Sequence, residues 1–88
     1  MIARVQSLGP QDQPDGTWKE VRVLVDGEHL VVSAKGPRAW KVRGRYRPVA
    51  KSPNPPHKRE IYILQGEAKI LLRIPASSRA VVVIDSLI

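Results

Sequence analysis

Cations alternate with apolar or small residues throughout residues 40–47 of this sequence. Successive side chains of an extended strand point to opposite faces, so the alternation predicts a strand with one cationic face and one face in the core. A helix would scatter the same cations around its axis. The expected outer row is Lys41, Arg43, Arg45 and Arg47, and the expected inner row is Trp40, Val42, Gly44 and Tyr46. Such a cationic row can bind phosphate oxygens, and Gly44 is expected to bend the strand.

The charge of the whole chain indicates an anionic partner. Fifteen Lys and Arg residues against eight Asp and Glu residues give a formal charge of +7. Residues 29–59 contain nine of the fifteen cations and no acidic residue, and such a single-sign field favours a polyanion site over a surface that is merely soluble. Besides the four cations of the alternating stretch, this segment contains Lys35, Arg38, Lys51, Lys58 and Arg59. A solvated basic surface is the alternative interpretation.

Residues that commonly carry catalysis are scarce. The chain has no cysteine and only two histidines, His29 and His57, so metal and thiolate sites have few candidate residues. There is no glycine-rich phosphate loop and no grouping of Ser, His and acid, and the carboxylates of Glu60, Glu67 and Asp85 are isolated. We therefore expect a protein that is not an enzyme and that needs no cofactor or metal.

The N-terminal half of the chain predicts strands joined by a tight hairpin. Residues 1–8 are the expected first strand, and the polar residues 9–17 are an expected loop. Strict alternation follows, interrupted by Asp-Gly at residues 26–27, which is a strong signal for a two-residue turn. That turn predicts a register with Val23 opposite Leu30, so that apolar residues meet on one face.

The other face of this hairpin is expected to gather polar residues around a tryptophan. The set is Trp18, Arg22, His29 and Lys35, with Trp18 opposite Lys35. A surface tryptophan beside cations either covers one end of a barrel or stacks on a nucleic-acid base. Both interpretations of Trp18 remain open at this point.

The C-terminal half predicts a long loop and further strands. Residues 48–58 are rich in proline and cations and are expected to form a loop. Residues 59–65 and 68–74 have strand character, and residues 79–84 are so apolar that they predict a last strand covered on both faces or in contact with another subunit. A homodimer through residues 79–88 is therefore expected. No segment has helical periodicity, so no helix longer than about two turns is expected.

Six or seven short strands in one domain predict an all-β fold in the form of a small closed or partly open barrel, either OB-fold-like or SH3-like, because an open sheet would expose its edges. Residues 42–47, the Pro-Asn-Pro loop, and the strands at residues 59–63 and 68–71 resemble the closing half of OB-fold nucleic-acid-binding domains. These include domains that bind single-stranded DNA and anticodon-binding domains of some aminoacyl-tRNA synthetases. The resemblance covers residues 40–72.

The resemblance implies binding across the second and third strands, with residues 9–17 and 48–58 as clamping loops. Nucleic-acid binding needs only cations and stacking aromatics, and we expect single-stranded DNA or RNA in preference to duplex, with little sequence specificity. The expected contact residues are Trp18, Arg22, Lys35, Arg38, Lys41, Arg43, Arg45, Arg47, Lys51, Lys58 and Arg59. The alternative is a barrel that serves protein interaction or assembly, with its basic face solvated or bound to an acidic protein segment.

The sequence predicts no membrane partner. Its longest apolar run, residues 80–84, is far shorter than the roughly 20 residues of a spanning helix. The N-terminal residues lack the charged and apolar regions of a secretory signal. We therefore expect the cytoplasm as the compartment.

Overall fold

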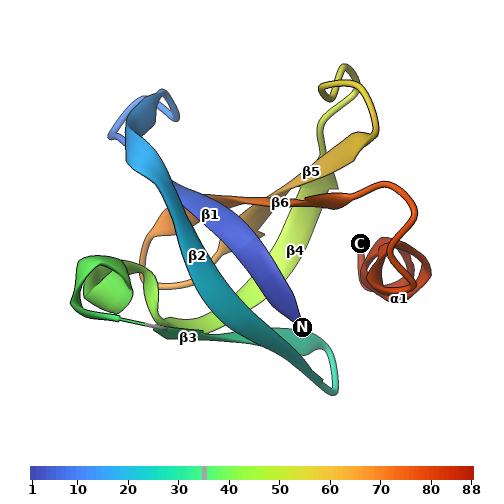
Figure 1. Ribbon diagram of the computed structural model, residues 1–88, viewed down its shortest axis with the longest axis horizontal. Helices are drawn as coiled ribbons and strands as arrows, with labels where there is room; N and C mark the ends of the chain where they lie inside the picture. Colours follow the sequence, from blue (N-terminus) through green and yellow to red (C-terminus); the bar gives the residue numbers. More distant parts are fainter. Residues whose placement is uncertain (35) are drawn as a thin grey trace.

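Six antiparallel strands form a closed barrel in the computed structural model, which describes residues 1–34 and 36–88, with Arg38 described by its backbone alone (Figure 1). The strands are β1 (Ile2–Leu8), β2 (Pro14–Asp26), β3 (His29–Ala34), β4 (Gly44–Lys51), β5 (Arg59–Gln65) and β6 (Lys69–Pro75). A 3₁₀ helix, η1 (Pro37–Val42), precedes β4, and a short helix, α1 (Ala80–Ser86), follows β6. The predicted small all-β barrel is confirmed.

The strands follow one another around the barrel in sequence order. Each strand pairs with the next, and β1 pairs with β6 to close the ring, with Arg4 opposite Arg73. This is an up-and-down order, whereas an OB-fold is a five-stranded Greek-key barrel. The resemblance of residues 40–72 to OB-fold domains is therefore a resemblance of local pattern and does not extend to strand order.

Apolar side chains that alternate along the strands fill the barrel. Tyr62, the largest fully buried side chain, and Leu64 point inward from β5. Ile61 and Ile63, which alternate with them, are only partly buried. The other fully buried residues of the strands include Val5, Val21, Val23, Leu30 and Leu72. Since the period of a strand is two, this core determines which side chains of each strand face outward.

The loop after β1 is shorter than predicted. It covers residues 9–13, because β2 begins at Pro14 and Ser7 already pairs with Asp15. The side-chain amide of Gln6 donates a hydrogen bond to the carbonyl of Gly16 at 2.8 Å and helps to hold this pairing. Polar composition alone predicted a loop over residues 9–17, but backbone groups can pair in a ladder whatever their side chains are.

The β2–β3 hairpin turns one residue later than predicted. Asp26 pairs with His29, so the two loop residues are Gly27 and Glu28. Gly27 has a φ of +61° and Glu28 is not in the positive-φ region, which is the pattern of a type II′ turn with glycine in the first position. Asp26 therefore ends the strand and does not form part of the turn.

The predicted register of this hairpin was wrong by two residues. Val23 lies opposite Val32 and not opposite Leu30, which pairs with Val25. Because the shift is two residues, every side chain keeps its predicted face, and Val23 still meets a buried residue. The alternating pattern therefore could not distinguish the two registers. Lys35, the predicted partner of Trp18, lies outside the described residues.

The predicted strand at residues 40–47 begins later than expected, at Gly44. The residues before it form η1, in which Ala39 donates to the carbonyl of Gly36 at 3.2 Å and Arg43 to that of Trp40 at 3.4 Å. Ala39 and Val42 are buried at a spacing of three, the period of a 3₁₀ helix. Trp40 consequently points outward and is 58% exposed, so its predicted place in the core was wrong.

Pro48 belongs to β4, so the loop predicted for residues 48–58 covers residues 52–58. Pro48 is buried and lies opposite Leu64, and the register shifts between Pro48 and Ala50. A bulge is one of the few places where a sheet accepts proline, because the missing N–H then interrupts no regular ladder. Gly44, predicted as a bend inside the strand, is its first residue and has a φ of +154°.

Residues predicted as a last strand form a helix instead. In α1, Ile84 is fully buried against the barrel, and Val82 is 75% exposed. The hydroxyl of Ser78 accepts a hydrogen bond from the Ala80 N–H at 3.2 Å and starts the helix. β1 already pairs with β6, so a further strand would have no edge to join, and burial of one helical face overrides the β-propensity of valine. With seven residues, α1 stays within the predicted limit of about two turns.

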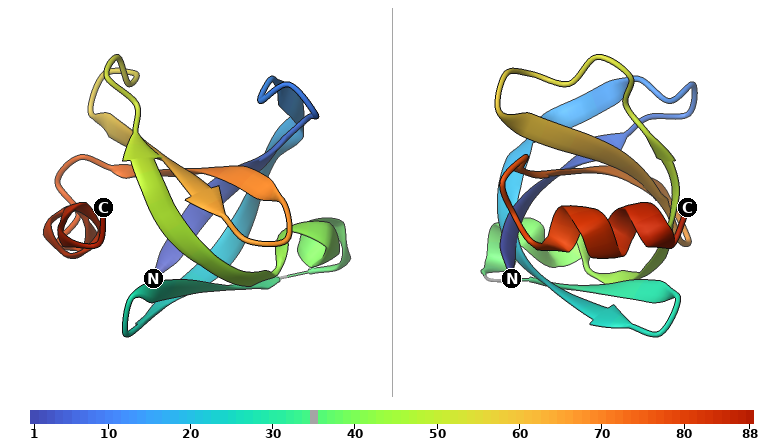
Figure 2. Two further views of the ribbon diagram at one scale, coloured as in Figure 1. Left: turned by 180° about the vertical axis from the view of Figure 1, so that it is seen from behind. Right: turned by 90° about the vertical axis from the view of Figure 1, so that its right-hand side faces the viewer.

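The helices cover opposite ends of the barrel (Figures 1 and 2). η1 closes one end with Ala39 and Val42, and α1 covers the other with Ile84. Within the described part of the chain, neither is long enough to pass through a lipid bilayer. The segment after β3 therefore lies at the end that η1 closes, and the loop after β4 lies at the end that α1 covers.

Candidate nucleic-acid interface

The arginines of residues 43–47 point outward, as the alternation predicted. Tyr46 and Pro48 are buried, and Arg43, Arg45 and Arg47 are exposed. The hydroxyl of Tyr46 donates to the carbonyl of Val42 at 2.8 Å, which joins the start of β4 to the end of η1. The direction of the arginine row is thus fixed by buried neighbours.

Neighbouring strands extend this row into a surface. Arg45 lies opposite Val31 of β3, which lies opposite Leu24 of β2. Arg22 lies opposite Ser33, and Ser33 and Arg43 line the same shallow pocket. We call this area the arginine surface, and it consists of Arg22, Leu24, Val31, Ser33, Arg43, Arg45 and Arg47. Its members come from β2, β3, β4 and the residue before β4.

Two acidic residues border the arginine surface. Arg45 forms an ion pair with Asp26 at 3.0 Å, and both side chains are more than half exposed, at 57% and 60%. Glu67 lines a second shallow pocket together with Arg43 and Arg45. Exposed ion pairs contribute little to stability, so a ligand with a stronger negative charge can displace Asp26 from Arg45 at small cost.

Trp40 joins the arginine surface at the end of the barrel that η1 closes. The guanidinium carbon of Arg43 lies 3.3 Å from the centre of the Trp40 ring. The sequence analysis missed this contact because it placed Trp40 in the core. The signal was present in the spacing of Ala39 and Val42, which fits a 3₁₀ helix that leaves Trp40 outside.

A second cationic surface crosses β1, β2, β5 and β6. Arg73 lies over the ring of Trp18 at 4.6 Å and opposite Arg4, and Arg4, Arg59 and Arg73 line one pocket. The sequence analysis missed Arg4 and Arg73. Both follow from alternation in the strands at residues 2–8 and 68–74, because Val5 and Leu72, their neighbours, are apolar. We call Arg4, Trp18, Arg59 and Arg73 the second surface.

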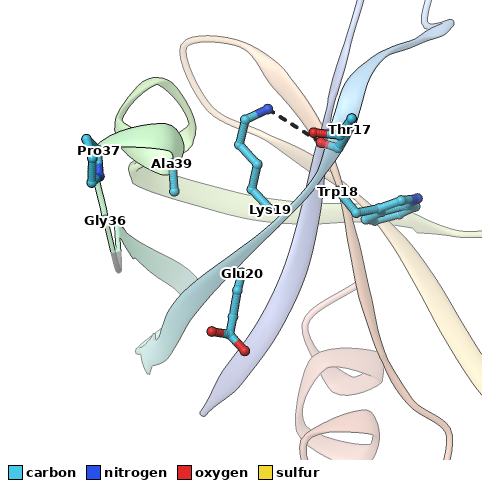
Figure 3. Close-up of a pocket in the computed structure, with 7 residues that line it drawn as sticks. All are labelled: Thr17, Trp18, Lys19, Glu20, Gly36, Pro37 and Ala39. Atoms are coloured by element: carbon cyan, nitrogen blue, oxygen red, sulfur yellow. Dashed lines mark hydrogen bonds between the residues drawn. The ribbon is translucent and has the colours of Figure 1, made fainter.

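Trp18 lies apart from the arginines of β4. A hollow of about 480 Å³ lies between β2 and η1, and its lining includes Trp18 together with Thr17, Lys19, Gly36 and Pro37. Figure 3 shows the Trp18 side chain directed away from η1. The ammonium of Lys19, the next residue, donates a hydrogen bond to the carbonyl of Thr17 at 3.4 Å. Trp18 is half-buried under Arg73 and belongs to the second surface.

Lys51 is held by carboxylates near α1. Its ammonium lies 3.1 Å from Asp85 and 3.5 Å from Glu60, and the hydroxyl of Tyr62 donates to Asp85 at 2.7 Å. Hydrogen bonds from Tyr62 and then Lys51 lower the pKa of Asp85, and the hydrogen bond to Asp85 raises the pKa of Lys51. Burial, and then the bond to Asp85, raises the pKa of Tyr62. This cluster joins α1 to β4 and β5.

The predicted contact residues therefore separate into groups. Arg22, Arg43, Arg45 and Arg47 come together on the arginine surface, with Lys41 exposed on η1 beside it. Three of the other predicted residues, Lys51, Lys58 and Arg59, lie near the end of the barrel that α1 covers, and Arg59 also belongs to the second surface with Trp18. Lys35 and the side chain of Arg38 lie outside the described residues. The clamping loops were expected at residues 9–17 and 48–58, and the loops observed there, residues 9–13 and 52–58, extend from opposite ends of the barrel (Figure 1).

No protein-family model, curated protein or solved structure matches this chain. Among the described residues, His, Asp and Glu form no group of three or more that could hold a metal ion. The two cationic surfaces are therefore the candidate binding sites of this protein.

Proposed function

We propose that this protein is a non-catalytic nucleic-acid-binding protein that binds through the arginine surface. The observation that supports this proposal is that Arg22 of β2 lies on one face with the row of Arg43, Arg45 and Arg47, although it is distant from them in the sequence. Guanidinium groups match the geometry of phosphate oxygens and stay charged at every physiological pH. The apolar residues between them, Leu24 and Val31, offer contact area for sugars and bases.

The expected ligand is single-stranded DNA or RNA, bound with little sequence specificity. The preference for single strands rests on the local resemblance of residues 40–72 to OB-fold domains and on the exposed Trp40. Phosphate contacts carry no sequence information, which accounts for the expected tolerance of sequence. On the sequence argument alone, we also propose the cytoplasm as the compartment.

Salt dependence tests the electrostatic part of the proposal. If about five phosphates of a single strand are neutralised, log K should fall with log salt with a slope of about −3.5. Removal of one contacting arginine should make that slope shallower by about 0.7. Fluorescence anisotropy of a labelled oligonucleotide at several salt concentrations measures both.

A pair of double variants tests which surface binds. Arg43→Glu with Arg45→Glu should abolish binding at physiological salt, whereas Arg4→Glu with Arg73→Glu, which changes the net charge by the same amount, should leave most of it. Circular dichroism should show that both variants are folded. Unchanged binding of both single and double strands by the first variant would refute the proposal, and loss in the second variant alone would move the site to the second surface.

Assembly through α1 is a second candidate function, in which the basic face is solvated or holds an acidic protein segment. It is favoured by exposed apolar side chains at the C-terminal end, where Val82, Val83 and Ile88 are 75%, 42% and 54% exposed. A homodimer would bury them. Light scattering that gives the mass of a monomer at high concentration would contradict it.

A further inference from the structure

We infer that Trp40 is a stacking site for one nucleobase of a single strand whose phosphates follow the arginine surface. The inference rests on the proposed function and adds a residue that contacts a base, where the arginines contact the phosphate backbone. It also assigns the stacking role to a different residue from Trp18, which is among the contact residues expected from the sequence.

Exposure singles out Trp40 among the aromatic residues. The chain has four aromatic residues, all of them described. Tyr46 and Tyr62 are buried, with exposed fractions of 4% and 0%. Trp18 is half-buried under Arg73, and Trp40 is 58% exposed. An exposed large apolar side chain costs solvation energy, and tryptophan is prominent where proteins bind partners. Trp40 is therefore the most exposed of the four aromatic rings.

The ring is held in place before any ligand binds. Ala39 and Val42, on either side of Trp40, are buried, and the hydroxyl of Tyr46 binds the Val42 carbonyl at 2.8 Å. Arg43 covers one side of the ring at 3.3 Å. A base that stacks on this ring thus adds to an existing cation–π pair, and the binding loses little side-chain freedom.

The surroundings of Trp40 offer room and polar groups for a base. A shallow pocket of about 350 Å³ is lined by Ser33, Ala34, Gly36, Pro37, Trp40 and Arg43. A Cβ placed on Gly36 would meet no atom of the described residues within 4 Å, its chain neighbours aside, so the pocket is open there. The Ser33 hydroxyl can donate or accept a hydrogen bond, and Arg43 can donate to a base edge or a phosphate.

Position connects this pocket to the phosphate contacts. Arg43 belongs both to the Trp40 pair and to the arginine row, and Arg45 is the next outward residue on β4. A nucleic-acid strand that follows Arg47 and Arg45 along β4, and then Arg43 before it, arrives at Trp40. A base in a duplex is stacked between its neighbours, so a ring at this place favours single strands.

The test compares two probes with the same backbone charge. They are an oligothymidylate and an abasic deoxyribose-phosphate oligomer of equal length. The native protein should bind the oligothymidylate more tightly, and Trp40→Ala should weaken that binding by about 5- to 150-fold while leaving the abasic probe and the salt slope unchanged. Trp40→Phe should restore part of the loss, and Trp18→Ala, the matched control, should keep the preference for the oligothymidylate.

The outcomes separate this inference from the proposed function. If the native protein binds both probes equally well, the stacking site is refuted and the phosphate site stands. If it binds neither probe, the proposed function fails. If circular dichroism shows that Trp40→Ala is unfolded, the Trp18→Phe variant provides the test instead, because its tryptophan fluorescence comes from Trp40 alone. Quenching of that fluorescence by the oligothymidylate but not by the abasic probe supports stacking, and no quenching by either overturns it.

Discussion

Gly66, in the turn between β5 and β6, occupies a position where a side chain has no room. A Cβ there would lie 2.7 Å from the carbonyl oxygen of Arg45 and 2.8 Å from the ring of Tyr46. Gly66→Ala should therefore shift the start of β4 and lower the free energy of unfolding by about 1–3 kcal/mol. Urea denaturation measures this effect.

Gly36 provides the matched control for this substitution. A Cβ at Gly36 would lie within 4 Å of no described atom outside its chain neighbours, and the Gly36 φ of −167° is ordinary extended backbone. Gly36→Ala should therefore leave stability nearly unchanged. Equal stability of the two variants would show that the Gly66 contact is relieved by a small movement of the chain.

Outward-facing arginines were predictable from the sequence, but the stacking of Arg73 on Trp18 was not. Alternation around Tyr46 was enough to orient Arg45 and Arg47, because strand period and burial determine direction. Arg73 meets Trp18 only because β2, β1 and β6 lie side by side in the closed ring. A contact of that kind depends on strand order, which local patterns do not contain.

Among the elements, α1 depends on an ionised carboxylate. Its Asp85 has a pKa below the usual value of 3.8, first because of the hydrogen bond from Tyr62 and then because of that from Lys51. A lowered folded-state pKa means that this stabilisation is present above pH 3.8 and is lost as the pH falls through the folded-state pKa. Thermal unfolding below about pH 4 should therefore show a smaller acid-induced loss for Asp85→Asn than for the native protein.

Two variants check the source of this acid sensitivity. Tyr62→Phe keeps the buried ring and removes the hydroxyl that donates to Asp85, so it should reproduce part of the effect. Asp15→Asn, which changes an exposed acid of β2, should retain the acid-induced loss of the native protein. The assignment to Asp85 is wrong if Asp85→Asn follows the native curve.

Two apolar positions of α1, one buried and one exposed, should differ in how strongly substitution changes stability. Ile84 is fully buried, so Ile84→Ala should cost about 2–5 kcal/mol through lost burial and a cavity. Val82 is 75% exposed, so Val82→Asp should change stability by no more than about 0.5 kcal/mol. Denaturant unfolding of both variants distinguishes this helix from the strand that the valines predicted, since in a covered strand Val82→Asp would unfold the domain.

Elements were predictable where one pattern acted alone, and were wrong where two patterns overlapped. The strand at Arg59–Gln65 was predicted with its observed bounds. In residues 79–88, the inward positions of a helix, 80, 81, 84 and 87, were hidden by three consecutive valines. In residues 37–42, a spacing of three at Ala39 and Val42 competed with an alternation of two. In both cases, packing at a barrel end decided the conformation.

At the scale of the whole molecule, the closed ring limits how a protein partner can bind. Each of the six strands has a neighbour on both sides, so no strand in the described part of the chain leaves its whole edge free for a peptide to join. A partner can bind through side chains on the arginine surface, the second surface or α1. These surfaces come from distant parts of the chain, and this is why the composition of the sequence indicated an anionic ligand but not its place.

The closure of the ring by β1 and β6 also has a consequence for how fast the chain folds. Neighbouring strands pair across short connections, but Arg4 meets Arg73 only after nearly the whole chain has been brought together. Loop closure over such a distance costs entropy before any contact repays it, and proteins dominated by distant contacts fold in milliseconds to seconds. We expect the β2–β3 and β5–β6 hairpins to form early and the seam between the first and last strands to form late. Until it closes, β1 and β6 both expose free edges, and the nascent chain is at its most vulnerable to aggregation.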